Sequence, residues 1–332
     1  MDKEKAYLVI HPKAEQHVDD ILTILEERWE TTPLVTAYAG HGIEIAANAQ
    51  EQGYHWVIAY GGDGTLNEVV NGAMQAQQPC NIGALPGGTV NQWAHEIGLP
   101  AHPVDAARTL IMSTPRSVDI GFVEVHALEF PDEIHYQHEI ASKATARHHF
   151  LLIAGLGVDA ATIQTTTESS KQQFGQLAFM LGWLQTLPEM QPFPSQVRWS
   201  TAQSWEGQPL EILVSNTRRY ANVGNLIPEA FVNDGLLDIR ILSIFSPENV
   251  LFHPFQDHSF SLRVPASIAL QLDGSSMQLA DYVSQEDWTR LQEATDLDKV
   301  MVTYRFTVKP SALPMAIPHD YTGELFNGAL RH

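Results

Sequence analysis

A glycine-rich turn is the segment of this chain best suited to chemistry. Its residues, Gly61-Gly62-Asp63-Gly64-Thr65, follow an apolar run at 56–60 and precede a helical pattern. Glycines let a backbone approach phosphate closely and point several N–H groups at one place, and a helix N-terminus adds partial positive charge. Asp63 suits such a loop when a divalent cation lies between it and the phosphates. The alternative is a tight turn in which Thr65 caps the helix.

A second turn of the same kind, Pro86-Gly87-Gly88-Thr89, follows the apolar run at 82–85 and also leads into a helical pattern. Two such turns at the carboxyl ends of neighbouring parallel strands face one crevice, where open α/β sheets bind ligands. Alone, the second turn is as readily explained as a capped connection. Together the two turns predict a receptacle for the phosphates of a nucleoside triphosphate.

Alternating elements in the first third of the chain position both turns at strand ends. Apolar runs predict strands at 7–10, 34–36, 56–60 and 82–85, and amphipathic patterns predict helices at 18–29, 43–52 and 66–74. Strands that alternate with helices form a mostly parallel sheet covered by helices. We therefore predict an α/β fold whose N-terminal domain, residues 1–117, is a doubly wound nucleotide-binding domain.

The pattern changes after about Ser117. Turn signals then separate strand-like runs at 118–125, 148–153, 196–200, 210–215, 236–242, 259–264, 267–272 and 302–308, with one helix at 175–187 and an extended hairpin at 137–147. Such runs are typical of an antiparallel sandwich. We predict a mainly antiparallel β-sandwich domain at 118–308 that holds a lipid or other substrate, with the tail at 309–332 packing back on the first domain.

Composition narrows the class of protein. The 332 residues include 19 basic and 39 acidic side chains, a formal net charge of −20, which argues against nucleic acid as a partner. The single cysteine, Cys80, excludes an internal disulfide framework and a zinc site built on paired cysteines. No apolar run is long enough to cross a bilayer, and the run at 6–10 is too short for a signal peptide. We expect a cytoplasmic protein.

Several motifs in the same order resemble the diacylglycerol kinase and sphingosine kinase superfamily, in its bacterial lipid kinase branch. They lie at 36–44, 61–72, 83–100 with its Gly88-Thr89-x-Asn91 core, 154–160 (Ala-Gly-Leu-Gly-Val-Asp-Ala), 228–238 (Pro-Glu-Ala-Phe-Val-Asn-Asp-Gly-Leu-Leu-Asp) and 272–274 (Leu-Asp-Gly). The resemblance therefore covers nearly the whole chain. The related NAD kinases share the first glycine turn, but their later motifs are not found here.

The resemblance implies an ATP- and Mg²⁺-dependent kinase that phosphorylates a diacylglycerol-like lipid alcohol. It implies nucleotide contacts at Thr36, Gly61, Gly62, Asp63, Gly64, Thr65, Asn67 and Thr89. It also implies a Mg²⁺ site with the carboxylate of Asp234 and the main-chain carbonyls of Phe231 and Leu236 as ligands, although Asn-Asp-Gly between apolar runs is also a hairpin signal. The expected catalytic residues are Asp63, which would direct Mg²⁺, and Asp273, which would assist the acceptor hydroxyl.

The chain departs from the family pattern at three places. His11 stands where relatives usually carry Asn, and Gln92 and Ser275 stand where the family expects Asp and Glu. Ser275 replaces the residue usually credited as proton acceptor, a role typically worth about 10²–10⁴-fold in rate. Asp273 is then the candidate to replace it, or a hairpin residue. A degenerate kinase that binds nucleotide or lipid without efficient turnover is the alternative function.

The resemblance also suggests partners: a lipid alcohol as substrate and a membrane surface in transient contact. A homodimer is compatible with the sequence, which does not decide the oligomeric state. The acidic charge keeps a soluble alcohol as a further acceptor class. Three other features have ordinary explanations beside functional ones. The histidines 135, 138, 148 and 149 fit a solvated strand face better than a metal site. The apolar helix at 174–184 is core or lipid contact, and Arg218-Arg219 is surface or a phosphate contact.

Overall fold

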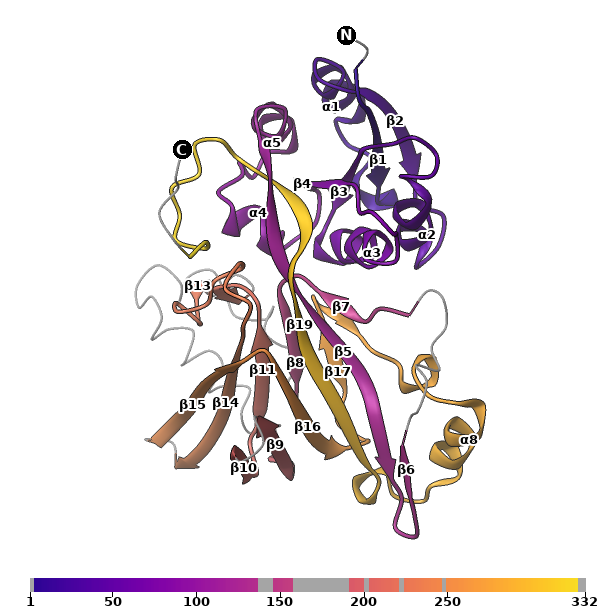
Figure 1. The fold of residues 1–332 in the computed structure, drawn as a ribbon, viewed down its shortest axis with the longest axis vertical. Coiled ribbons are helices and arrows are strands. Elements are labelled where there is room, and N and C mark those ends of the chain that lie inside the picture. The colour runs from indigo at the N-terminus through magenta and orange to yellow at the C-terminus, as the bar shows by residue number, and fades with distance from the viewer. Residues whose placement is uncertain are drawn as a thin grey trace.

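The first part of the chain forms a parallel sheet with helices on both faces. The computed structural model describes residues 3–136, 146–157, 191–199, 203–220, 224–246 and 249–327 (Figure 1). The strands β1 (Lys5–Ile10), β2 (Glu30–Val35), β3 (Trp56–Gly61) and β4 (Asn81–Pro86) lie parallel in the order β2-β1-β3-β4. Every residue of β3 is buried, as expected for a central strand covered on both faces.

Two apolar clusters hold these helices to the two faces. The helices are α1 (Val18–Leu25), α2 (His41–Asn48), α3 (Asp63–Ala73), α4 (Gln92–Glu96) and α5 (Pro103–Leu110), with a short 3-10 helix, η1, at Pro12–Ala14. One cluster joins α2, α3 and α4 to the sheet, and the other joins α1 and α5 to its opposite face. The doubly wound arrangement predicted from the sequence is therefore confirmed.

The second part of the chain is mainly antiparallel. A six-stranded sheet has the order β15-β14-β11-β8-β17-β18. Its strands are β8 (Ile153–Leu156), β11 (Glu211–Ser215), β14 (Leu237–Ser246), β15 (Asn249–Asp257), β17 (Leu270–Leu272) and β18 (Ser275–Ser276). A third apolar cluster packs it against β5 (Thr114–Glu129), β9 (Ser195–Trp199), β16 (Ser259–Pro265) and β19 (Met301–Ile317). The predicted β-sandwich is confirmed.

The two parts share one sheet, because β5 and β19 are long enough to run through both (Figure 1). These strands pair from Met301↔Glu129 to Ile317↔Thr114, and Met315 also pairs in parallel with Ile82 of β4. The result is an eleven-stranded sheet that continues from the N-terminal α/β part into the sandwich. The expected strands at 118–125 and 302–308 are thus only the middle portions of β5 and β19.

Smaller elements complete the fold. They are β6 (Ile134–Tyr136), β7 (His149–Phe150), β10 (Gln203–Gly207), β12 (Arg219–Tyr220), β13 (Gly224–Asn225), α8 (Gln285–Glu293) and the 3-10 helices η4 (Leu279–Asp281) and η5 (Leu297–Lys299). The expected strand at 148–153 is split into β7 and β8. The helix expected at 175–187 and most of the hairpin at 137–147 lie outside the described residues. Within the part of the chain that is described, no helix combines the length and apolar character needed to cross a membrane.

Candidate functional site

The two glycine turns lie against each other at the carboxyl ends of β3 and β4. The Gly87 N–H donates to the Gly61 carbonyl at 2.9 Å. A Cβ placed on Gly88 would lie 2.5 Å from the Gly62 Cα, so only glycine permits this approach. The Asn91 side chain accepts from the Gly88 N–H and donates to the Gly88 carbonyl, both at 2.8 Å, which fixes the second turn.

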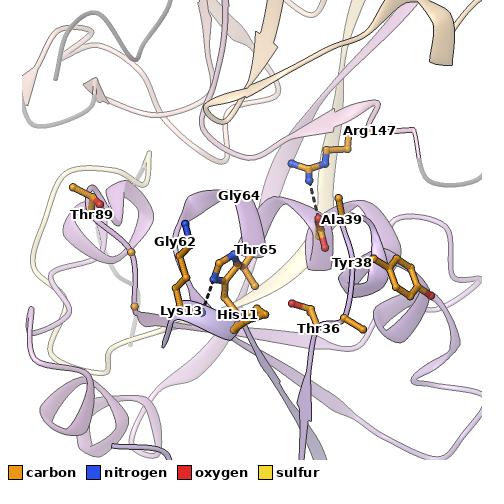
Figure 2. Close-up of a pocket in the computed structure, with 15 residues that line it drawn as sticks. His11, Lys13, Thr36, Tyr38, Ala39, Gly62, Gly64, Thr65, Thr89 and Arg147 are labelled. Carbon is orange, nitrogen blue, oxygen red and sulfur yellow. Dashed lines mark hydrogen bonds and ion pairs between the residues drawn. The ribbon is translucent and has the colours of Figure 1, made fainter. Parts of the chain in front are cut away.

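A cavity of about 800 Å³ opens between these turns and the segment after β2 (Figure 2). Its lining includes five residues predicted to contact nucleotide: Thr36, Gly62, Gly64, Thr65 and Thr89. The helix α3 begins at Asp63, so the positive end of its dipole lies at this cavity. Backbone turns and a helix N-terminus at one cavity form a surface suited to phosphate.

Asp63 is not among the residues that line the cavity, and its role beside a cation stays a prediction. Its two carboxylate oxygens accept the N–H groups of Gln92 at 2.9 Å and Trp93 at 3.3 Å, the first residues of α4. Burial raises the pKa of Asp63, although these N–H groups act in the opposite direction. The carboxylate therefore caps α4 and ties the first turn to the second. Gly61 and Asn67 are likewise absent from the lining.

Asp273 is not among the residues that line the cavity either, and its role as proton acceptor stays a prediction. Its side chain is buried and accepts the N–H groups of Leu151, Leu152 and Ile153 at 2.9–3.0 Å. The Asn67 side-chain amide donates a fourth bond at 2.9 Å. Burial raises the pKa of Asp273 to about 6 in spite of these donors. The carboxylate bends the chain between β7 and β8 and joins it to α3, which explains the split strand.

Besides His11, four charged or aromatic side chains at the cavity were not predicted as nucleotide contacts: Lys13, Tyr38, Glu68 and Arg147. Figure 2 shows Lys13 and Arg147 beside the first glycine turn, on different sides of it. The described lining thus carries two cations and one acid, in a chain whose formal net charge is −20. Lys13 follows the carboxyl end of β1, a signal that the sequence offered. Arg147 comes 84 positions after Asp63 and offered none.

Tyr38 lies at the mouth of the cavity. The residue is 53% exposed, and its ring stacks on His41 with 4.8 Å between ring centroids, while its hydroxyl donates to Glu44 at 2.7 Å. The Thr36 side chain is buried deeper, and its hydroxyl lies 3.4 Å from the Ile10 carbonyl. The segment after β2 therefore contributes both a polar floor and an aromatic rim.

Each departure from the family pattern has a structural partner. His11 Nδ1 accepts the Lys13 N–H at 3.1 Å, so the imidazole caps η1 as an asparagine oxygen would. The Gln92 side-chain amide donates to the Arg219 carbonyl at 2.8 Å. An ionised acid, which the family has at this position, could not donate this hydrogen bond. The Ser275 hydroxyl accepts from Arg147 at 2.6 Å.

The predicted Mg²⁺ turn lies apart from the cavity lining. Asp234 accepts the Leu236 N–H at 3.0 Å, and Asp119 accepts the N–H groups of Gly235 and Ser311. Burial and the nearby Asp119 raise the pKa of Asp234, and burial is the main cause that raises the pKa of Asp238 to about 6. Crowded acids with oxygen donors fit a hard cation, although no cluster of three or more His, Cys, Asp or Glu suited to a metal occurs among the described residues.

The histidines and arginines singled out in the sequence divide among structural roles. His148 and His149 are mostly buried, and burial lowers the pKa of His149 to about 3. His135 lies 2.7 Å from Asp287, far from the glycine turns in sequence and on the β6 side of the sandwich. Arg218 pairs with Glu324 at 2.7 Å, which is a surface contact. His138 and the apolar segment 174–184 lie outside the described residues.

Comparison with known proteins agrees with this geometry. Residues 5–123 match the family described as the diacylglycerol kinase catalytic domain, and residues 153–255 match the YegS C-terminal NAD kinase beta sandwich-like domain. A diacylglycerol kinase of Bacillus subtilis is 28% identical, with 72% of this chain and 74% of that protein aligned. A Pseudomonas aeruginosa protein named "probable lipid kinase YegS-like" is 28% identical over 96% of each chain.

A crystal structure of a diacylglycerol kinase from Bacillus anthracis has the same fold. Its TM-score is 0.67 at 17% identity, with 97% of this chain and 100% of that one covered. The catalytic-domain match contains both glycine turns, and the sandwich match follows it in the order expected from the fold. The chain therefore carries a diacylglycerol kinase catalytic domain followed by a YegS C-terminal domain, and it is similar to proteins named diacylglycerol kinase and YegS-like lipid kinase.

Proposed function

We propose that this protein is an ATP- and Mg²⁺-dependent lipid kinase that phosphorylates the hydroxyl of a diacylglycerol-like lipid. The observation that carries the proposal is the cavity between the two glycine turns, where Lys13, Arg147 and the N-terminus of α3 meet. A cationic cavity in an acidic protein favours a polyanion. The diacylglycerol kinase catalytic domain and the similarity to proteins named lipid kinases support the choice of ATP as donor and of a lipid as acceptor.

The proposed reaction is a single phosphoryl transfer. The acceptor oxygen forms a bond to the γ-phosphorus while the bond from that phosphorus to the β–γ bridging oxygen breaks; ADP keeps that electron pair, and the hydroxyl proton passes to water. Positioning and charge stabilisation supply most of the catalysis of such a transfer. Thr36, Gly62, Gly64, Thr65 and Thr89 would position the nucleotide, and Lys13 would offset the charge of its phosphates.

Mg²⁺ has two places in this proposal. It would accompany the triphosphate as its usual counter-ion. It would also fit the turn 233–235, held by Asp234 and the carbonyls of Phe231 and Leu236, where its charge would relieve repulsion among Asp119, Asp234 and Asp238. Because that turn is absent from the cavity lining, we assign the second position to structure.

The second domain and a membrane surface complete the proposal. The sandwich at 118–308 would hold the lipid, and the protein would act from the cytoplasm with transient contact at the membrane, its oligomeric state left open. Transfer of phosphate from γ-labelled ATP to mixed micelles that contain diacylglycerol or other lipid alcohols tests this. A radiolabelled lipid that forms only with Mg²⁺ supports the proposal. Binding of ATP without transfer to any lipid or soluble alcohol would refute it.

A second candidate function is nucleotide binding without efficient turnover. It is favoured by the carboxylates: Asp63 and Asp273 are both engaged by N–H groups, and Glu68, the acid in the described lining, is engaged by Gly40, Gly42 and Arg147. No described lining carboxylate is thus available as a base. Turnover far below 1 s⁻¹ with saturating lipid, together with tight ATP binding, would favour this function over a typical kinase rate of about 1–100 s⁻¹.

A further inference from the structure

Arg147 enters the cavity from the second domain. It lies two residues before β7, and of the described lining residues it alone comes from beyond β5 (Figure 2). Its guanidinium donates to Glu68 Oε1 at 2.7 Å and to the Ser275 hydroxyl at 2.6 Å, and its side chain is 20% exposed. These two bonds use two of the five N–H donors of an arginine. The other three N–H donors have no role in these two bonds, and the Arg147 side chain that carries them lines the cavity.

The main chain around Arg147 fixes its position as well. Its N–H donates to the Tyr282 hydroxyl at 3.0 Å, and the same hydroxyl donates to the Arg147 carbonyl at 2.7 Å. Glu68 is itself held by the N–H groups of Gly40 at 2.8 Å and Gly42 at 3.1 Å, where α2 begins. The guanidinium is therefore anchored at both ends, and little rotamer freedom is lost when it binds an anion.

Ser275 determines how much positive charge Arg147 can offer. A Cβ on Gly64 would lie 3.6 Å from the Ser275 Oγ, so this hydroxyl lies next to the first turn of α3. A glutamate at position 275 would pair with Arg147, which would then face two carboxylates, its own partner Glu68 and the new one. With serine there, the guanidinium keeps one neutral and one acidic partner. The exchange leaves its charge available to an anion in the cavity.

We propose that Arg147 is a catalytic residue that binds the terminal phosphate of the nucleotide and stabilises its charge during transfer. The inference rests on the proposed function, since it assigns a role within that site. The transferred phosphoryl group must lie between the nucleotide loop and the domain that holds the acceptor. Arg147 is the described lining residue that comes from the second domain, so it faces that end of the phosphate chain. Ser275, which is neutral, positions Arg147 instead of accepting a proton.

Nucleotide binding tests the assignment without requiring turnover. Titration calorimetry with ADP and with an ATP analogue that carries a methylene β–γ bridge, in the presence of Mg²⁺, compares the wild type with Arg147→Met, Arg147→Lys and Arg305→Met. Arg305 is a partly exposed arginine paired with Glu124 at 3.5 Å, and its variant controls for the loss of one cation. We expect Arg147→Met to weaken the analogue about 10- to 100-fold and ADP less than about twofold. Arg147→Lys should restore part of the difference.

The results separate the two proposals. If the wild type binds neither nucleotide, the kinase proposal itself fails. If it binds both and Arg147→Met weakens them equally or not at all, Arg147 does not face the terminal phosphate and this inference is overturned.

Ser275→Glu supplies a second test in which Arg147 remains in place. We expect the new carboxylate to pair with Arg147, to weaken the analogue relative to ADP by about 10-fold or more, and to lower kcat. A rise in kcat with unchanged analogue affinity would show that a missing base limits the enzyme, which would overturn the role assigned to Arg147.

Discussion

Gln92 provides the sharpest test of how this chain tolerates the loss of a family acid. The side chain is 7% exposed, begins α4, and donates its amide to the Arg219 carbonyl at 2.8 Å. Gln92→Glu changes one NH₂ group to an oxygen with almost no change in shape. At pH 7 the bond is lost and a carboxylate oxygen faces a carbonyl oxygen, with the Asp63 carboxylate already bonded to the Gln92 N–H.

The cost follows from three contributions. The lost hydrogen bond is worth about 1 kcal/mol, and a buried acceptor left without a donor costs about 1–3 kcal/mol. A negative charge in the first turn of a helix returns about 0.5 kcal/mol. We therefore expect the free energy of unfolding to fall by about 2 kcal/mol. With a urea m-value of about 3 kcal/mol/M, the midpoint falls by about 0.7 M.

Gln285→Glu is a matched control, because Gln285 also begins a helix but is exposed. There the new charge meets solvent and the helix dipole, so stability should stay within about 0.5 kcal/mol of wild type or rise slightly. Urea unfolding of both variants at pH 7 and pH 4 is the assay. At acid pH the protonated carboxyl of the Gln92→Glu variant again offers a donor, so the deficit of that variant should shrink. Equal midpoints for the two variants at pH 7 would refute the reasoning.

Three other substitutions test separate parts of the structure. Gly88→Ala places a methyl group 2.5 Å from the Gly62 Cα, which should push the two turns apart and weaken ATP binding at least about 10-fold. The control Gly155→Ala, whose methyl group would lie 3.6 Å from the nearest atom, should leave ATP binding unchanged. Equal affinities of the two variants in a nucleotide titration would contradict this. Asn71→Ala leaves the N–H groups of His148 and His149 without their acceptor and should lower the free energy of unfolding by about 2–4 kcal/mol. Hydrogen exchange checks this, because undiminished protection of those two amides would contradict it. Burial raises the pKa of Glu211 to about 8, so the stability linked to its proton is complete below about pH 4.5 and is lost as pH rises through 8. Glu211→Gln should therefore be more stable than wild type by about 3 kcal/mol at pH 7, and this difference should vanish near pH 4. Thermal melts that show the same difference at both pH values would argue against it.

Local sequence patterns predicted the N-terminal α/β half of the fold well. The strand at 56–60 became β3 (Trp56–Gly61), and the helix expected at 66–74 became α3, which begins three residues earlier. The buried apolar residues of these elements recur at the spacing of a strand or a helix, so the sequence pattern indicates where each element lies. The strand β2 was expected only at 34–36 because Pro33 interrupts its pattern, yet Pro33 is tolerated on this edge strand.

The charged part of the site was harder to predict than its glycine turns. Glycine turns are local, since their chemistry and their conformation reside in the same few residues. The partner of an acid is not local: Asp273 meets Leu151, and Asp63 meets Gln92, through contacts that only the tertiary fold defines. Family position therefore indicated which residues mattered, while the structure decided which of them face the cavity. The alternation of the second half predicted a sandwich but not that β5 and β19 continue out of it.

The shared sheet limits how this protein can open and close. At about 3.3 Å per residue, the 17 residues of β19 extend for about 55 Å, and its ladder with β5 is continuous except for irregularities at 303–304 and 309–313. A hinge swing of one half against the other would break that ladder. Twisting is cheaper, and it would concentrate at the second irregularity, where Ser311 has a positive φ of 49°. Admission and release of ligands should thus depend on torsion of a two-stranded ribbon and on loops at the rim, with the halves otherwise moving as a single body.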